Sequence, residues 1–342
     1  MPTPAPGRIE RTLAAILSFR IRRRVFLALL GATGWAAMSQ AREAGKPSRI
    51  GILTNRRDDD NWKRFVAGLK DDGYVEGQNL MIDWRYSEGQ VERWPALASE
   101  LVGLNVDVIV VTTTPAALAA KKVTITVPIV ITAAFDPVGS GLAHSLARPG
   151  GNVTGLGLLI PEISAKALAL FKEAVPHATR IAVLWNETNP VNALVWKEME
   201  VTAHARGLVL QSQPVLEAGD LDGAFTVLGK NPPDGVFIVF DALLYQYRNR
   251  IVEFVEHNRL PAASFFREFA ELGGLMSYGA NLPDMFHTAA TYVSKILDGA
   301  NPADMPIEQP TRFDLIINLK AAKALALTIP PTLLARANEV IE

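Results

Sequence analysis

The sequence predicts an α/β protein made of two similar lobes, each an open and mostly parallel sheet with helices on its faces. Strand-like apolar runs alternate with helical patterns from residue 49 to the C-terminus, as in βαβ units. The order of strands then repeats, since RIGILTN begins at 49 and RIAVLWN at 180, an offset of 131 residues. Polar and aromatic residues follow the ends of these strands, where open α/β sheets bind ligands.

The first lobe is expected to begin with a strand at 49–55 and a helix at 61–74. Trp62, Phe65, Val66 and Leu69 of that helix fall at the i, i+3, i+4 and i+7 positions of one face. Gly73 is a plausible C-terminal cap. A strand, a helix and two further strands are predicted at 80–89, 91–104, 106–115 and 127–132.

The second lobe is expected to repeat this plan. A helix at 192–207 follows the RIAVLWN strand, and strands follow at 208–215, 234–244, 260–265 and 273–279. The tail then supplies one more helix, strand and helix, in the segments 282–299 and 313–327. We expect this surplus to return to the first lobe, so that lobe 1 comprises 49–156 plus about 283–342 and lobe 2 comprises 157–282.

The segment between Asp136 and Gly155 is rich in glycine, but its spacing does not match a known glycine motif. It lacks the lysine of a phosphate-binding loop, the third glycine of a dinucleotide fingerprint and the G-x-S-x-G nucleophile turn. We therefore predict a short helix at 138–147, a turn at 147–152 and an extended segment at 153–159 that leaves the first lobe. Glycine in that segment would permit the dihedral changes of a hinge.

The N-terminus has the pattern of a secretory signal peptide over residues 1–41. The basic stretch RIRRR at 20–24 precedes an apolar run at 25–38, and SQA at 39–41 suits signal peptidase. The apolar run is too short for a durable membrane anchor. RRVFL at 23–27 fits the twin-arginine pattern, and a general secretory signal is the alternative. We expect a soluble periplasmic chain that starts near Arg42 and has no stable membrane insertion after cleavage.

The composition limits the classes of function. The chain has 342 residues, of which 49% are hydrophobic and 20% are charged, as expected for a folded protein of two domains. A net charge of −1 gives no reason to expect a nucleic-acid partner. The sequence contains no cysteine, which excludes disulfides, thiolate metal sites, a cysteine nucleophile and the usual lipoprotein anchor.

No catalytic constellation is found. The five histidines have no metal-ligand spacing, and the acidic run at 58–60 is interpreted as the cap of the following helix. We therefore predict no metal, no cofactor and no enzymatic activity. An enzyme of the same architecture is the less favoured reading.

The candidate ligand-binding residues share one position, at or near the carboxyl ends of the predicted strands. Free backbone N–H groups at the helix start after Thr112 would suit a carboxylate. Asp241 would either pair with a ligand ammonium or cap the next helix, and aromatic rings would sandwich a side chain. For each residue, capping or packing is an equal alternative. The set is Thr54, Asn55, Thr112, Thr113, Thr114, Phe135, Asp136, Trp185, Asn186, Asp241, Ser264 and Tyr278.

Two long motifs carry a family likeness. SLARPGGNVTGL at 145–156 and the C-terminal segment 289–342, together with the opening IGILT, resemble ABC-transporter substrate-binding proteins of the TrpX-like group. The resemblance implies a type I periplasmic-binding fold, with two Rossmann-like lobes, a multi-strand hinge and a small ligand held between them. It also implies an ABC permease and ATPase as partners. An amino acid or similar zwitterion is the expected ligand, and a ligand-sensing module of a signalling system is the alternative function.

Overall fold

The computed structural model describes residues 46–55, 60–158, 160–239 and 241–342. The predicted signal peptide and the acidic residues Asp58 and Asp59 lie outside them. Residues Ser48–Glu342 form one compact unit. Within the described ranges, no helix combines the length and the apolar character needed to cross a bilayer.

The first sheet has five parallel strands in the order β2-β1-β3-β4-β5. Its central strands are rich in β-branched residues and completely buried, as expected for a parallel sheet covered on both faces. The bounds are β1 Ser48–Thr54, β2 Leu80–Tyr86, β3 Val108–Val111, β4 Ile129–Phe135 and β5 Val153–Leu158.

The second sheet repeats this order and extends it by two strands, giving β12-β11-β10-β9-β8-β6-β7. Strands β7, β6, β8, β9 and β10 correspond in order to β2, β1, β3, β4 and β5, which is the duplication that the sequence predicts. The bounds are β6 Arg180–Trp185, β7 Val209–Pro214, β8 Gly235–Ile238, β9 Ala262–Ser264, β10 Met276–Ala280, β11 Phe313–Asn318 and β12 Glu339–Ile341.

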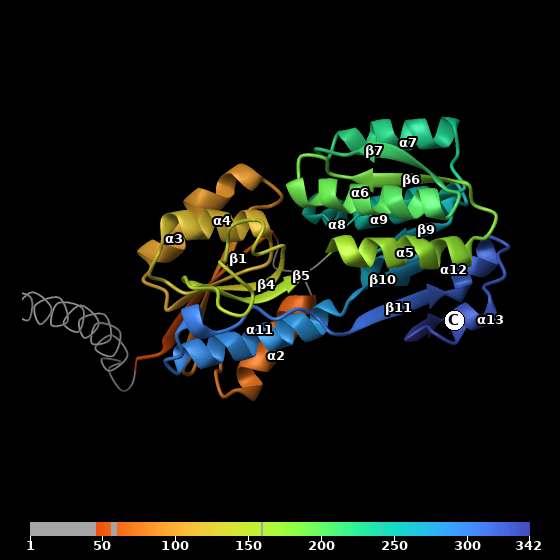
Figure 1. The fold of residues 1–342 in the computed structure, drawn as a ribbon. Coiled ribbons are helices and arrows are strands. Elements are labelled where there is room, and N and C mark those ends of the chain that lie inside the picture. The colour runs from red at the N-terminus through yellow and green to blue at the C-terminus, as the bar shows by residue number, and fades with distance from the viewer. Residues whose placement is uncertain (1–45, 56–59, 159, 240) are drawn as a thin grey trace, which may run out of the picture. The chain divides into compact units, whose positions relative to one another are not determined.

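Helices cover both faces of each sheet (Figure 1). In the first lobe, Ile50 and Ile52 face α2 and α11, whereas Ile109 and Val111 face α3 and α4. In the second, α5 and α6 lie on one face and α7, α9 and α10 on the other. The bounds are α2 Asp60–Asp71, α3 Trp94–Gly103, α4 Thr114–Val123, α5 Ile160–Ala174, α6 Pro190–Ala205, α7 Asp220–Lys230, α8 Ala242–Gln246, α9 Arg248–His257, α10 Arg267–Leu272, α11 Leu282–Leu297, α12 Leu319–Ala324 and α13 Pro331–Leu334. Short 3₁₀ helices occur at Val91–Arg93 and Pro302–Asp304.

The chain passes between the two sheets three times. It leaves the first sheet after β5, returns from β10 to α11, and crosses again between Glu308 and β11. The first and third connections run together, because Gly157 N donates to Glu308 O at 2.9 Å and Glu308 N donates to Gly155 O at 3.0 Å. These paired connections form a multi-strand link between the lobes.

The tail does not return to the first lobe as a whole. Helix α11 packs on α2 and the first sheet, as expected. However, β11 pairs antiparallel with β10, and β12 pairs with β11, so residues 313–341 extend the second sheet. The assignment of the entire segment 283–342 to lobe 1 therefore needs correction. The physical reason is that β10 has a backbone edge, which β11 satisfies with a ladder from Met276 to Ala280.

The segment 138–147 is also different from its prediction, because it forms turns rather than a short helix. Asp136 has a φ of 39°, and its Oδ1 accepts a hydrogen bond from Gly139 N at 2.8 Å, which closes a tight turn. Gly141 has a φ of 75°, outside the helical region. The extended segment that follows is confirmed as β5, but it belongs to the first sheet and leaves it only after Leu158.

Candidate functional site

The carboxyl ends of β1 and β2 lie together in the first lobe. Thr54 is buried, and its hydroxyl accepts a hydrogen bond from Trp62 Nε1 at 3.1 Å. Asn55 follows, and Ser87 Oγ donates to its Oδ1 at 2.5 Å. Thr54 therefore positions the first helix, and the Asn55 side chain ties the loop after β1 to the loop after β2.

The threonines after β3 divide into different roles. Thr113 caps α4 by accepting a hydrogen bond from Ala116 N at 3.4 Å. Thr114 is buried, and its hydroxyl both accepts from Phe135 N and donates to Phe135 O, each at 2.9 Å. It therefore joins the start of α4 to the end of β4. Thr112, the residue after β3, is half-buried.

The end of β4 is held by packing and a turn. Phe135 is buried in the core. Asp136 has its carboxylate engaged with Gly139 N in the turn described above. These two residues lie at the same sheet edge as Thr112, as predicted, but each has a structural contact that accounts for it.

In the second lobe, β6 ends in an aromatic residue and a polar turn. Trp185 is buried, stacks on Trp196 at a centroid distance of 5.1 Å and donates from Nε1 to Ser212 Oγ at 2.8 Å. Asn186 Oδ1 accepts from Thr188 N at 3.1 Å and from its hydroxyl at 2.7 Å. The Trp185 ring is consequently part of the protein core, and Asn186 stabilises the turn before α6.

Asp241 is the most buried charged residue of the predicted set. Its Oδ1 accepts from Leu243 N at 2.9 Å and caps α8, and its Oδ2 accepts from Asn189 Nδ2 at 3.2 Å. Burial raises the pKa of Asp241, and hydrogen bonds from Leu243 and Asn189 oppose that rise only in part. Of the two roles predicted for Asp241, capping is the one that these contacts describe.

The remaining two predicted residues are buried inside the second lobe. Ser264 Oγ donates to Ile238 O and accepts from Phe266 N, each at 3.2 Å. Tyr278 lies within β10 rather than at its end, and Lys166 Nζ lies 4.9 Å from its ring centroid. Phe240, the residue before Asp241, lies outside the described residues.

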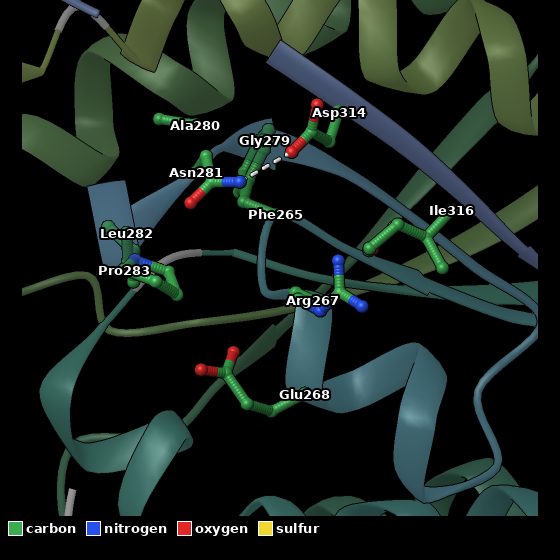
Figure 2. Close-up of a pocket in the computed structure, with 11 residues that line it drawn as sticks. Phe265, Arg267, Glu268, Gly279, Ala280, Asn281, Leu282, Pro283, Asp314 and Ile316 are labelled. Atoms are coloured by element: carbon green, nitrogen blue, oxygen red, sulfur yellow. Dashed lines mark hydrogen bonds between the residues drawn. The ribbon is translucent and has the colours of Figure 1, made fainter. Parts of the chain in front are cut away.

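A pocket opens at the carboxyl ends of β9 and β10 (Figure 2). Its lining includes Phe265, Glu268, Asn281 and Asp314, and Figure 2 shows the Asn281 amide directed at Asp314, to which Nδ2 donates at 2.8 Å. The cavity volume is about 10 Å³, which is room for on the order of one water molecule. It is thus too small to hold an amino acid by itself.

Sequence reasoning did not single out Glu268, which lines this pocket, or the two residues linked to it through Tyr245. Glu268 lies in the first turn of α10, and Tyr245 Oη donates to its Oε1 at 3.2 Å. The Arg248 guanidinium lies over the Tyr245 ring, with Cζ 4.3 Å from the centroid. These residues occur in helical segments, where charged residues usually mark a solvated face, so only their position relative to strand ends would have indicated a site.

Among the described residues, no group of three or more histidine or acidic side chains is arranged to hold a metal ion. The candidate residues near the strand ends are instead hydrogen-bonding side chains, aromatic rings and a few charges. Such a set suits reversible binding of a small polar molecule.

Comparison with known proteins identifies relatives over most of the chain. A family model described as ABC transporter substrate binding protein matches residues 55–341. A tyrosine-binding protein of Clostridioides difficile is 28% identical over 265 residues, which cover 77% of this chain and 75% of that protein. These relatives are solute-binding proteins, not enzymes.

Solved structures agree with this grouping. The ABC domain in complex with L-Trp from Streptococcus pneumonia superimposes with a TM-score of 0.78 at 26% identity, covering 86% of this chain and 100% of that one. A conserved domain protein from Vibrio cholerae gives a TM-score of 0.80 at 29% identity, with the same coverage. The predicted type I periplasmic-binding fold is confirmed by this similarity.

Proposed function

The chain belongs to the ABC transporter substrate-binding protein family, and on this premise we propose that it is the exported ligand-capturing component of an ABC importer. It would bind a small molecule between its lobes and deliver it to a permease and ATPase. The observation that supports this most directly is the pair of sheets that share the same order of five parallel strands and are joined by three chain connections. Two such lobes can close on a ligand by rotation about their connections.

The proposed ligand is an amino acid, with an aromatic side chain as the first candidate. The support is the ligand of two relatives, tyrosine for one and L-Trp for the other. The site would lie at the carboxyl ends of the two sheets, where Asn55, Thr112 and Asn186 follow their strands. Ligands of open α/β sheets usually bind next to the carboxyl ends of the strands.

Export to the periplasm is the second part of the proposal. Its support is the basic, apolar and small-residue pattern of residues 1–41. The mass of the protein recovered from the periplasmic fraction of an expressing bacterium tests it. Cleavage after Ala41 is expected, and a full-length chain confined to the cytoplasm would contradict export.

A thermal unfolding screen of the purified protein tests the ligand class. L-tyrosine, L-tryptophan and L-leucine are compared with nucleosides, sugars and dicarboxylates. A ligand at about a hundred times its dissociation constant stabilises the folded state by about 2.7 kcal/mol. A raised midpoint with amino acids alone is the expected result, whereas a shift only with another class would reject the amino-acid assignment.

A further inference from the structure

Resting on the proposed function, we infer that Arg248 binds the carboxylate of the captured amino acid. Arg248 is the first residue of α9, directly after the short helix that follows β8. In this role Arg248 would determine specificity for ligands that carry a carboxylate. The strand-end pattern of the sequence does not identify it, because it lies in a helix. Figure 1 shows α8 and α9 close together in the second lobe.

The Arg248 side chain is fixed at one end by two contacts with Tyr245. Its Nη1 donates to Tyr245 O at 2.8 Å, and its Cζ lies 4.3 Å from the centre of the Tyr245 ring. The ring is itself anchored, with its centroid 4.8 Å from that of Phe266 and its hydroxyl bound to Glu268. The guanidinium is thus held one aromatic ring away from the carboxyl end of β9.

The charge of Arg248 is not balanced within the described part of the chain. No Asp or Glu oxygen there forms an ion pair with it, and its buried Nε atom has no hydrogen-bond partner. By contrast, Arg250 on the same helix pairs with Asp222 at 2.6 Å, and Arg267 pairs with Glu271 at 2.7 Å. Binding of a carboxylate to a half-buried guanidinium is favourable, because the carboxylate accepts a hydrogen bond from the unpaired donor and balances the charge.

An acidic group contacts the same tyrosine, because the Tyr245 hydroxyl donates to Glu268 Oε1 at 3.2 Å. Glu268 and Asp314 line the pocket at the ends of β9 and β10. Arg248 and Glu268 thus place a positive and a negative group against the same aromatic side chain, an arrangement that is complementary to a zwitterion with its carboxylate toward Arg248. A guanidinium matches a carboxylate through two parallel N–H donors, which an ammonium cannot do.

Calorimetric titration of matched ligand pairs tests this inference. L-tyrosine is compared with tyramine, and L-tryptophan with tryptamine, because each amine lacks only the carboxylate. For the wild-type protein we expect the amines to bind about 10- to 100-fold more weakly. In R248Q we expect the amino acid to lose a similar factor while the amine is unaffected, so that the ratio between them falls toward one. R248K should lie between the two.

The control is R250Q, which removes an exposed arginine of the same helix and should leave the ratio at its wild-type value. Thermal unfolding of each variant checks that it is folded, and R248K carries the test if R248Q is not. An unchanged ratio in a folded Arg248 variant would overturn the inference while leaving the proposed function intact. If the wild-type protein binds none of the amino acids, the proposed function itself fails and the inference fails with it.

Discussion

The carboxylate of Asp234 holds the first residue of β6, because its Oδ2 accepts a hydrogen bond from Arg180 N at 2.8 Å. In the first lobe, Asp107 Oδ2 accepts from Arg49 N at the same distance of 2.8 Å, at the start of β1. In each case the acidic residue lies just before the neighbouring strand of the sheet. The duplication therefore extends from strand order to individual side-chain contacts.

Replacing Asp234 by alanine should destabilise the protein in a pH-dependent way. The hydrogen bonds from Thr179 and Arg180 lower the pKa of Asp234 below its ordinary value. A lowered pKa means that the ionised form stabilises the fold at neutral pH and that this contribution is lost as the pH falls below about 4. We expect a loss of about 1–2 kcal/mol at pH 7 in urea unfolding. An equal loss at pH 3 would contradict this account.

Replacing Asp241 by alanine should show the opposite pH trend. Burial raises the pKa of Asp241, so its ionised form is penalised in the folded protein and its net contribution to stability decreases as the pH rises above its ordinary pKa. Loss of the α8 cap should lower the free energy of unfolding by about 1 kcal/mol. The difference from wild type, measured by urea unfolding, should be larger at pH 4 than at pH 8.

The same variant separates the two roles of Asp241. If it only caps α8, the affinity for an amino acid should change little once the protein is folded. If it binds the ligand ammonium, calorimetric titration of D241A should show that the affinity is lost while far-ultraviolet dichroism stays native.

Gly155→Ala should destabilise the first sheet. Gly155 has a φ of 122°, and a Cβ atom built there would lie 2.2 Å from the Ile131 carbonyl oxygen of the neighbouring strand. The strain and the steric overlap together predict a loss of about 2–4 kcal/mol in thermal or urea unfolding. Gly151→Ala is the matched control, since a Cβ atom at that residue would have no heavy atom within 4 Å. Equal stability of the two variants would show that β5 can shift to make room.

Tyr292→Phe should loosen the third connection between the lobes. The Tyr292 hydroxyl lies 2.7 Å from Pro306 O and 2.8 Å from Glu308 Oε1, and burial with the Glu308 hydrogen bond raises the pKa of Tyr292. Removing the hydroxyl should cost about 1 kcal/mol in urea unfolding. Tyr74→Phe, which removes an exposed contact to Asp298, should cost less. A larger effect at Tyr74 would argue against this role for Tyr292.

The fold was predictable from the sequence to the extent that its signals are local. Alternating strand and helix patterns and the 131-residue repeat are readable along the chain, and they correspond to the shared strand order of the two sheets. The pairing of β11 with β10 was not readable, because a strand's partner is chosen by the edge available in three dimensions. Likewise, a short helix was expected at 138–147, but the left-handed Gly141 and the Asp136 turn are not helical.

The candidate site was less predictable than the fold. Most of the predicted residues lie near strand ends in the structure, yet Thr114, Ser264 and Asp241 use their side chains to bind backbone groups. The sequence did not single out Arg248 or Glu268, since each is an ordinary helical charge, and only the structure shows that both contact Tyr245. Residue type alone does not tell side chains that support the fold from side chains that could contact a ligand, and their geometry is needed.

The packing of α11 on α2 has a consequence for how the chain is made. Residues 48–158 supply all the strands of the first sheet, but Trp62 of α2 makes its closest ring contact, 5.0 Å between centroids, with Phe286 of α11. During synthesis the apolar face of α2 would therefore remain exposed until α11 is made, more than a hundred residues after the last strand of the first sheet. Completion of the first lobe therefore requires α11, a helix near the C-terminal end of the chain.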